Sequence, residues 1–470
     1  MKRFLSLVLI LMMTVSMASC GSPANSGPAE SPPSQPGDSG SPAAPAAPAE
    51  PKFIEDDTSI SGTVRFWIPF KGDQGMDAMI AEFNKVYPNI KVELTTYNNN
   101  AEGNVAVNTA LMSGEIDVLH SFELHNAFKR WESGLYKDIT DEIAADGIDL
   151  VKNWGSDDYK YNGRVYTLPA GGRSFYVAIN MNEWNAAGLG EIPKQWTWDE
   201  YLEACKAMTH GAGADKVYGG SQYQAINSVY NSMYQVYGKN ALYNAEGMSS
   251  ADDPVIKKAL SREVQAENVD SIWFPLTTYR SDNLQAQQTY LTNRIATSLN
   301  NNLIRFIRDT ATYPVDFITA FAPFPTEEPG QPNYMEGVSI FSHVGIASQH
   351  NKDNYDAIYA FLKWYATEGS AYLVVAGHMP TWVNTDVDNM LSIIFGSEEA
   401  ASKLIDVESY KRVAFNYDGL TYVDTELTAY SEINSLMQEY VMNAHYGEMS
   451  VDEALSTLKT LSDEAIEAGR

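Results

Sequence analysis

The stretch of residues 159–184 constrains the fold of this chain more than any other part of the sequence. Residues 161–168 alternate around Asn162-Gly163, a dipeptide that tolerates the positive φ angles of a tight hairpin turn. Pro169 is expected to end this run. Residues 170–172, an alanine and two glycines, have so little side-chain volume that they can absorb a change of backbone angle between two rigid bodies. This stretch is therefore predicted to be a hinge.

A second packed unit is expected to begin directly after the hinge. The apolar run of residues 175–179 predicts a new strand that can line the gap between the units, and a helix should start near Asn182. From about residue 54 to residue 470 the chain is long enough for two lobes with separate cores.

The N-terminal residues 1–19 are expected to be a secretory signal peptide, because two basic residues precede an apolar run that is too short to span a bilayer. Cys20, followed by Gly21, resembles a bacterial lipobox, in which the cysteine is lipid-modified and becomes the first residue of the mature chain. Met17 stands where that motif usually has Leu. The alternative is an ordinary signal peptide that is cut at a small residue.

Residues 20–52 are predicted to be the lipidated cysteine and a disordered linker. From residue 21 onwards this segment is mostly Pro, Ala, Ser and Gly, and it has almost no large apolar residue with which to pack a core. A tether of this kind would let a folded body stand away from a membrane.

Charge and cysteine content exclude several classes of protein. The formal net charge of −28 would repel phosphates at long range, which argues against nucleic acid or anionic lipid as a partner. Besides Cys20 the chain has only Cys205, so no disulfide framework is expected. Cys205 is predicted to be a small, buried apolar residue on a helix.

The first elements after the linker read as a β-α-β unit. Residues 62–69 have alternate apolar residues on one face, residues 75–86 repeat apolar residues at helical spacing, and residues 90–96 form the next strand. Such a unit predicts a parallel sheet with ligands at the carboxyl ends of its strands. A third short strand, residues 116–119, runs out into residues 120–125, which include the polar residues Glu123 and His125.

Several short motifs then occur in the order of family 1 extracellular solute-binding proteins, which are the sugar-binding components of bacterial ABC importers, as maltose-binding protein is. These motifs are FWIPFKGDQG, SGEIDVLHSF, ESGLYKDITDEI and GRVYTLPAGGRSFYVAINMNEWNAAGL. The resemblance continues in IPKQWTWDEYLEACKAMT, where Thr197 and Glu200 form a capping box. The sequence departs from the family at Ile116, where the family has Pro, and at residues 300–302, where three asparagines replace Gly and Trp.

The resemblance implies an α/β fold with two lobes, each a mostly parallel sheet flanked by helices, and several hinge crossings between them. The crossings are expected near Pro169, within residues 338–346 and near Pro380. The first lobe is expected to contain residues 53–169 and 345–380. The second is expected to contain residues 170–344 and 381–470.

Candidate ligand residues follow from the chemistry of sugars. Sugars offer apolar C–H faces and many hydroxyls, so their sites combine flat aromatic rings with planar groups such as Asp, Asn, Glu and Arg. Residues of these types near strand ends and crossings are Trp67, Phe70, Asp73, Glu123, His125, Arg173, Tyr176, Tyr223, Asn300, Asn301, Glu336 and Trp382. The alternatives are that Trp67 packs under the first helix, that Tyr176 belongs to the core, and that Tyr223 packs in a helix.

No cofactor, metal site or catalytic residue is expected. Residues 211–220 have Lys216 at the third glycine position of a dinucleotide loop, and the sequence has no Walker loop, HExxH motif or G-x-S-x-G elbow. One alternative class is a lipid-anchored glycoside hydrolase, whose chemistry needs two carboxylates that face each other across a cleft. Another is a binding protein for a polyamine, a peptide or a different non-sugar solute, and Arg173 argues against the polyamine.

The resemblance therefore implies a binding protein that is anchored by lipid to the outer face of a bacterial cell membrane, with a Gram-positive cell favoured. It is expected to be a monomer that captures a carbohydrate, with an oligosaccharide favoured, in the cleft between its lobes. The membrane permease of an ABC importer is the expected recipient of the ligand.

Overall fold

The computed structural model describes residues 51–221, 225–300, 302–416, 419–420 and 422–470. All of these belong to one compact unit. The signal peptide, Cys20 and the linker up to residue 50 lie outside the described residues, as do Tyr223 and Asn301. Within the described ranges, no helix combines the length and the apolar composition that crossing a membrane requires.

The larger sheet has six strands in the order β11-β4-β10-β3-β1-β2. In chain order, its strands are β1 (Gly62–Ile68), β2 (Ile90–Thr96), β3 (Val118–Phe122), β4 (Thr167–Arg173), β10 (Ser339–Ile346) and β11 (Met379–Pro380). Strand β1 pairs in parallel with both β2 and β3, which confirms the predicted β-α-β unit. Its residues Val64, Phe66 and Ile68 are fully buried because alternate side chains of a strand share one face.

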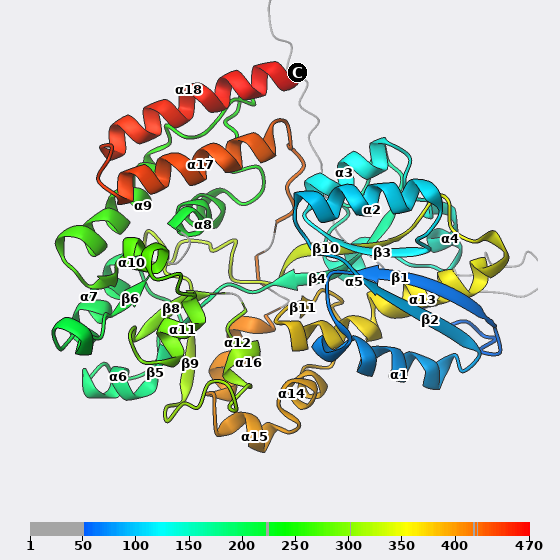
Figure 1. Ribbon diagram of the computed structural model, residues 1–470, viewed down its shortest axis with the longest axis horizontal. Coiled ribbons are helices and arrows are strands. Elements are labelled where there is room, and N and C mark those ends of the chain that lie inside the picture. Colours follow the sequence, from blue (N-terminus) through cyan, green and yellow to red (C-terminus); the bar gives the residue numbers. More distant parts are fainter. Residues whose placement is uncertain (1–50, 222–224, 301, 417–418, 421) are drawn as a thin grey trace, which may run out of the picture. The chain divides into compact units, whose positions relative to one another are not determined.

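Helices cover both faces of this sheet. Helices α2 and α3 lie on one side and α1 and α13 on the other (Figure 1). The helices of this region are α1 (Met76–Val86), α2 (Ala101–Ser113), α3 (Leu124–Glu132), α4 (Thr140–Ala145), α5 (Leu150–Trp154) and α13 (Tyr355–Ala366), with 3₁₀ helices at Gly72–Gln74, Lys352–Asn354 and Glu368–Ala376. The predicted third strand and the helix after it exist, with β3 beginning at Val118 and α3 at Leu124.

The predicted hinge stretch is partly corrected by the structure. The turn at Asn162-Gly163 is confirmed, since both residues have positive φ and Tyr161 and Arg164 exchange two backbone hydrogen bonds. Pro169 does not end the run that leads to it. Strand β4 continues through Pro169 to Arg173, because β10 and β11 pair with it on either side and supply its hydrogen-bond partners.

The smaller sheet has three strands in the order β8-β5-β9, namely β5 (Tyr176–Asn180), β8 (Thr297–Asn300) and β9 (Thr319–Pro323). All of its pairings are antiparallel, and so are those of β10 and β11 in the larger sheet. The prediction of mostly parallel sheets is therefore wrong for these two sheets beyond β1, β2 and β3, although the short pair of β6 (Gly220–Ser221) and β7 (Trp273–Phe274) is also parallel. It rested on the β-α-β unit, which comprises only the first strands, and the later strands return in the opposite direction.

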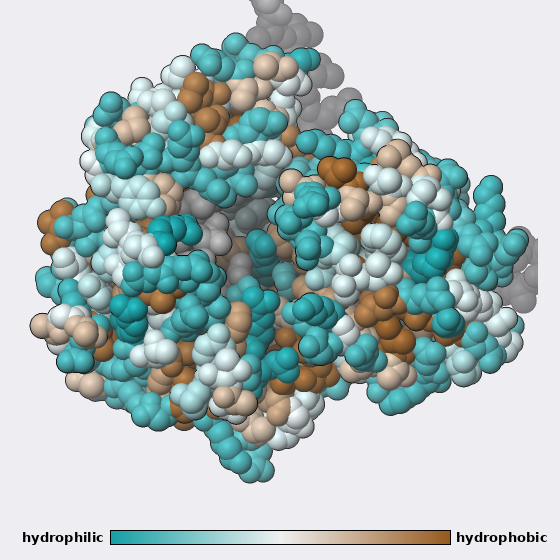
Figure 2. Space-filling view, viewed as in Figure 1, coloured by the Kyte–Doolittle hydropathy of each residue, from teal (hydrophilic) through white to brown (hydrophobic). Residues whose placement is uncertain are grey.

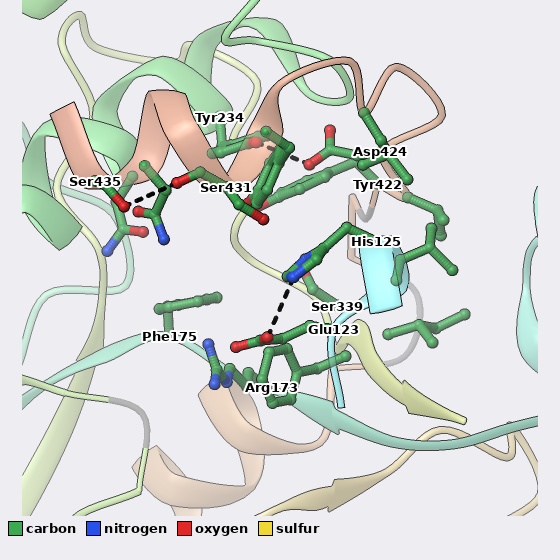
Figure 3. A pocket seen from close by; sticks show the side chains of 18 of the residues that line it. Glu123, His125, Arg173, Phe175, Tyr234, Ser339, Tyr422, Asp424, Ser431 and Ser435 are labelled. Atoms are coloured by element: carbon green, nitrogen blue, oxygen red, sulfur yellow. Dashed lines mark hydrogen bonds and ion pairs between the residues drawn. The ribbon is translucent and has the colours of Figure 1, made fainter. Parts of the chain in front are cut away.

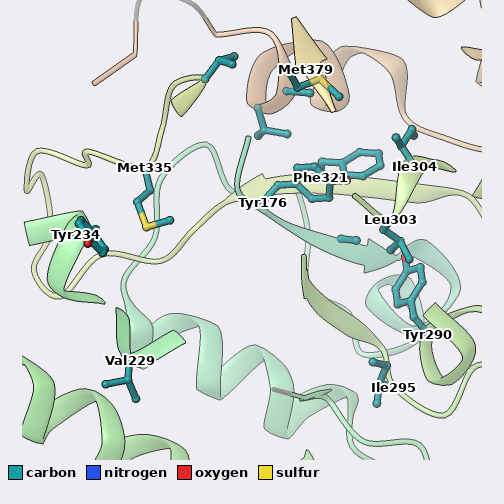
Figure 4. Packing of buried hydrophobic residues seen from close by; sticks show 14 of the residues in the cluster. Tyr176, Val229, Tyr234, Tyr290, Ile295, Leu303, Ile304, Phe321, Met335 and Met379 are labelled. Atoms are coloured by element: carbon teal, nitrogen blue, oxygen red, sulfur yellow. The ribbon is translucent and has the colours of Figure 1, made fainter. Parts of the chain in front are cut away.

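A second core surrounds the three-stranded sheet. Tyr176 is fully buried there and packs edge-on against Phe321, with 5.1 Å between ring centroids; Figure 4 shows both among buried neighbours such as Tyr290 and Met335. The helices of this region are α6 (Met181–Ala186), α7 (Trp198–Met208), α8 (Ala225–Tyr237), α9 (Pro254–Val264), α10 (Leu276–Ser281), α11 (Ala286–Leu291), α12 (Ile304–Ile307), α14 (Val387–Phe395), α15 (Glu398–Ser402), α16 (Val407–Ala414), α17 (Tyr430–His445) and α18 (Val451–Gly469). A two-stranded sheet of β6 (Gly220–Ser221) and β7 (Trp273–Phe274) completes it, with a 3₁₀ turn at Gly213–Asp215 and a π-helical turn at Gln265–Val269.

Local sequence signals account for the boundaries of several of these elements. The predicted capping box opens α7, where the Glu200 N–H donates to Thr197 Oγ1 at 3.3 Å and the Thr197 N–H donates to Glu200 Oε2 at 2.7 Å. On the same helix Cys205 is fully buried, as predicted. Helices α17 and α18 pack against each other along the C-terminal part of the chain (Figure 1).

Candidate binding site

A cavity of about 500 Å³ lies between the end of the six-stranded sheet and the helices α8 and α17. This volume falls in the range of about 300 to 1,000 Å³ that is typical of small-molecule sites. The surface is hollowed between α17 and the region of β10 and α3 in the space-filling view of Figure 2. Close by, Figure 3 shows side chains from these separate parts of the chain converging on one space.

Glu123 lies where β3 ends and α3 begins, with its backbone in an unusual conformation. Its φ of 65° is rare for a residue other than glycine and costs about 1 to 3 kcal/mol. The surrounding structure holds it there, because the Glu123 N–H donates to the carbonyl oxygen of Phe341 in β10 at 3.1 Å. The strained backbone directs the carboxylate into the cavity.

His125 connects the two walls of the cavity. Its Nε2 lies 3.6 Å from Glu123 Oε2, and its ring stacks on Tyr430 of α17 with 5.5 Å between centroids. Burial lowers the pKa of His125, which outweighs the opposite effect of the Glu123 charge. The imidazole is therefore neutral at pH 7 and serves as a flat surface and a hydrogen-bonding group.

Arg173 lies at the end of β4 with its guanidinium flat against an aromatic ring. The guanidinium carbon is 3.2 Å from the centroid of the Phe341 ring, a close cation–π contact. Burial lowers the pKa of Arg173 to about 10, an effect that the charge of Glu123 partly opposes, so the side chain stays positively charged at pH 7.

The opposite wall is built by residues that the sequence analysis did not identify. Tyr234 of α8 and Tyr422 stack nearly in parallel, with 4.5 Å between ring centroids and 5° between planes. The Tyr234 hydroxyl donates to Asp424 Oδ2 at 2.8 Å, and the Asn240 N–H donates to Asp424 Oδ1 at 2.6 Å. Burial raises the pKa of Asp424.

Helix α17 presents a polar face to the cavity. Its lining residues recur at helical spacing and carry hydroxyl and amide groups, and Asn231 of α8 adds another amide; on α17 they are Tyr430, Ser431, Asn434, Ser435 and Gln438. Amides and hydroxyls both donate and accept hydrogen bonds, so this face suits a ligand that is rich in hydroxyls. The sequence shows the spacing of these residues, but the polar face of a solvated helix has the same spacing.

The structure brings three of the predicted ligand residues, Glu123, His125 and Arg173, into the cavity. Glu336 lines a separate cavity of about 210 Å³ beside Trp196. Tyr176 lies in the second core, in line with the alternative given for it.

Trp67, Phe70, Asp73 and Trp382 are not among the described residues that line the 500 Å³ cavity. Phe70 is buried in the core beside the six-stranded sheet, and Trp67 and Trp382 pack against that core. Asp73 is exposed in the first 3₁₀ turn. Asn300 lies opposite Tyr176 in the β5–β8 pair, and Tyr223 and Asn301 are outside the described residues.

Comparison with known proteins gives matches along most of the chain. Residues 69–372 match the model of a family described as bacterial extracellular solute-binding protein. The multiple sugar-binding protein of Streptococcus mutans is 24% identical over 133 residues, which is 28% of this chain and 30% of that protein. The chain thus matches about a third of the length of this relative.

Solved structures share the fold over almost the whole chain. A sugar transporter from Rhizobium etli in an open conformation has a TM-score of 0.68 at 16% identity, covering 87% of this chain and 100% of that one. The sugar-binding protein MalE of Xanthomonas citri has a TM-score of 0.65 at 15% identity, with 87% and 98% covered. A substrate-binding protein from Listeria monocytogenes, in complex with cycloalternan, has a TM-score of 0.65 at 16% identity, with 86% and 98% covered. The predicted two-lobed α/β fold is confirmed.

Proposed function

Because the chain belongs to the family of bacterial extracellular solute-binding proteins, we propose that it captures a carbohydrate, with an oligosaccharide favoured, and delivers it to the permease of an ABC importer. The family consists of binding proteins, so the expectation of a binding protein instead of a glycoside hydrolase is confirmed. The names of the Streptococcus mutans relative and of the sugar-binding structures support a carbohydrate as the ligand.

The composition of the cavity carries this proposal. Stacked Tyr234 and Tyr422 offer an aromatic surface for the apolar face of a sugar ring, and the amides and hydroxyls of α17 offer partners for its hydroxyl groups. Glu123 and Arg173 add planar charged groups, whose hydrogen bonds are stronger than those between neutral groups.

Binding is proposed to close two lobes on the ligand, one of residues 53–169 and 345–380 and one of residues 170–344 and 381–470. Glu123 contacts the ligand from one side and α17 from the other, so a ligand that fills the cavity binds the closed arrangement better and shifts the population toward it. The permease then recognises the closed form.

The location is proposed from the N-terminal sequence. Cys20 carries a lipid on the outer face of the cell membrane, with a Gram-positive cell favoured, and the linker up to residue 52 holds the folded part away from the membrane. Apart from this anchor the protein is proposed to be a monomer whose membrane partner is the permease.

A ligand screen tests the proposal on a chain that lacks residues 1–19 and carries Cys20→Ser. A ligand present at about 1,000 times its Kd stabilises the native state by about 4 kcal/mol, so the melting temperature should rise with one or more mono-, di- or oligosaccharides. Each sugar that binds should be recovered intact by chromatography. Stabilisation only by peptides or polyamines would overturn the sugar, and a cleaved sugar would overturn the binding-protein assignment.

A further inference from the structure

Arg173 lines the cavity without a carboxylate partner among the described residues, unlike three arginines elsewhere in the protein. Arg65 pairs with Asp117 at 2.6 Å, Arg164 with Asp138 at 2.5 Å and Arg262 with Glu327 at 2.8 Å. Arg173 makes no hydrogen bond or ion pair through its side chain with any residue that the structure describes. Its contact is with the face of the Phe341 ring, which leaves the N–H groups at the edge of the guanidinium plane facing the cavity.

The two carboxylates that line the cavity accept hydrogen bonds from groups other than Arg173. Glu123 accepts a hydrogen bond from Asn126 Nδ2 at 3.2 Å and lies beside His125. Asp424 accepts from the Tyr234 hydroxyl and the Asn240 N–H. Among the described residues the cavity therefore holds one cation that makes no direct salt bridge, and Figure 3 shows Arg173 beside Phe175 and Glu123.

We propose that the ligand is an acidic sugar and that Arg173 binds its carboxylate, the group that a uronic acid carries. This inference rests on the proposed function, of which it names the substrate class. A partly buried cation without a salt bridge is unfavourable, and a ligand carboxylate offsets that penalty by accepting two parallel N–H bonds from the guanidinium. The ring of Phe341 holds the guanidinium plane in one orientation before the ligand arrives, which reduces the entropy lost on binding.

The charges of the cavity favour a carboxylate over a phosphate monoester. Arg173 is the positively charged residue of the lining, while Glu123 and Asp424 are acids on either side of the space. A ligand with one negative charge can pair with Arg173 and is repelled less by the two acids than a ligand with two charges. A phosphate monoester carries almost two charges at pH 7, and the second would be repelled by the two acids.

The experiment compares acidic with neutral sugars by isothermal titration calorimetry at pH 7 on the Cys20→Ser chain without residues 1–19. The probes are mono-, di- and trisaccharides of glucuronic and galacturonic acid, each matched with the glucose or galactose sugar of the same length and linkage. A hydrogen bond to a charged group contributes about 1.5 to 3 kcal/mol, so the acidic member of a pair should bind about 10 to 150 times more tightly.

Two variants test whether this preference for acidic sugars depends on Arg173. Arg173→Gln should remove it: affinity for the acidic sugar should fall by a larger factor than affinity for the neutral sugar, so that the two members of a pair bind about equally. Lys216→Gln removes a positive charge from a partly exposed side chain that does not line the cavity, and it should leave both affinities unchanged. The comparison on the unsubstituted chain does not depend on either variant folding.

The possible results separate this inference from the function on which it rests. Equal or tighter binding of the neutral sugars would overturn the acidic ligand and leave carbohydrate capture intact. A preference for acidic sugars that survives Arg173→Gln would overturn the role of Arg173. Absence of binding by every sugar of both kinds would overturn the proposed function, and this inference with it.

Discussion

Substitutions of two glycines in β4 test whether this segment is a hinge or a closely packed strand. The sequence alone suggests that Gly171 and Gly172 provide backbone freedom, but both lie inside the strand and neither has a positive φ. A Cβ at position 172 would lie 2.6 Å from Val338 Cγ1 and 2.7 Å from the carbonyl oxygen of Ser339. We therefore predict that Gly172→Ala destabilises the protein because β10 is too close.

The neighbouring glycine provides a matched control. A Cβ at position 171 would lie 2.6 Å from Ser342 Oγ, but that oxygen belongs to a side chain that can rotate, whereas the Ser339 carbonyl is backbone that pairs with β4. Overpacking costs about 1 to 3 kcal/mol, and replacing Gly by Ala returns about 0.4 to 1 kcal/mol by restricting the unfolded chain. The net loss should be about 1 to 2 kcal/mol for Gly172→Ala and close to zero for Gly171→Ala.

Urea unfolding followed by tryptophan fluorescence measures this difference. Gly172→Ala should unfold at a clearly lower urea concentration than the unsubstituted chain, and Gly171→Ala at nearly the same concentration. If both variants unfolded together with the unsubstituted chain while ligand affinity changed, the close-packing argument would be refuted. The glycines would then act as a hinge, as their residue type alone suggests.

Three further predictions concern other parts of the protein. Burial opposes the charged form of His445, but hydrogen bonds to Glu263 and Glu267 raise its pKa from 6.5 to about 9. The stability that protonated His445 contributes should therefore be complete below pH 6.5 and lost as the pH rises through 9. Urea unfolding from pH 6 to 10 should show this loss of stability in the unsubstituted chain and not in His445→Gln. Lys363→Ala removes the fully buried cation that pairs with the partly exposed carboxylates of Glu55 and Asp146. It should lower the free energy of unfolding by about 3 kcal/mol, the low end of the range for broken buried ion pairs, and urea unfolding measures this loss. Tyr422→Ala should weaken sugar binding about tenfold, or about 1.4 kcal/mol, in calorimetry, and unchanged affinity would exclude this ring from the site.

Part of the candidate site could be predicted from the sequence because of where its residues lie along the chain. Glu123 and His125 follow the first parallel strands, and ligands bind at the carboxyl ends of such strands. Arg173 was identified by its place after the small residues of β4. For these residues a sequence position next to a strand end corresponds to a position at one edge of the sheet.

The other wall of the cavity could not be located in this way. Tyr234, Tyr422 and Asp424 meet only because α8 and the segment before α17 come together across almost two hundred residues. The polar face of α17 looks like that of any solvated helix until its neighbours are known. The resemblance to binding proteins indicated the kind of site, but not which aromatic residues form it.

The sequence by itself determined the local elements, because periodicity, caps and turns depend on residues a few positions apart. The β-α-β unit, the Thr197–Glu200 capping box and the Asn162-Gly163 turn are of this kind. Only the tertiary structure decided that β4 runs through Pro169 and that Tyr176 lies in the core. Both outcomes depend on strands far along the chain: β10 and β11 extend β4, while β8 and β9 enclose β5. Hydrogen bonding and burial across a sheet are set by such distant partners, and no local pattern specifies them.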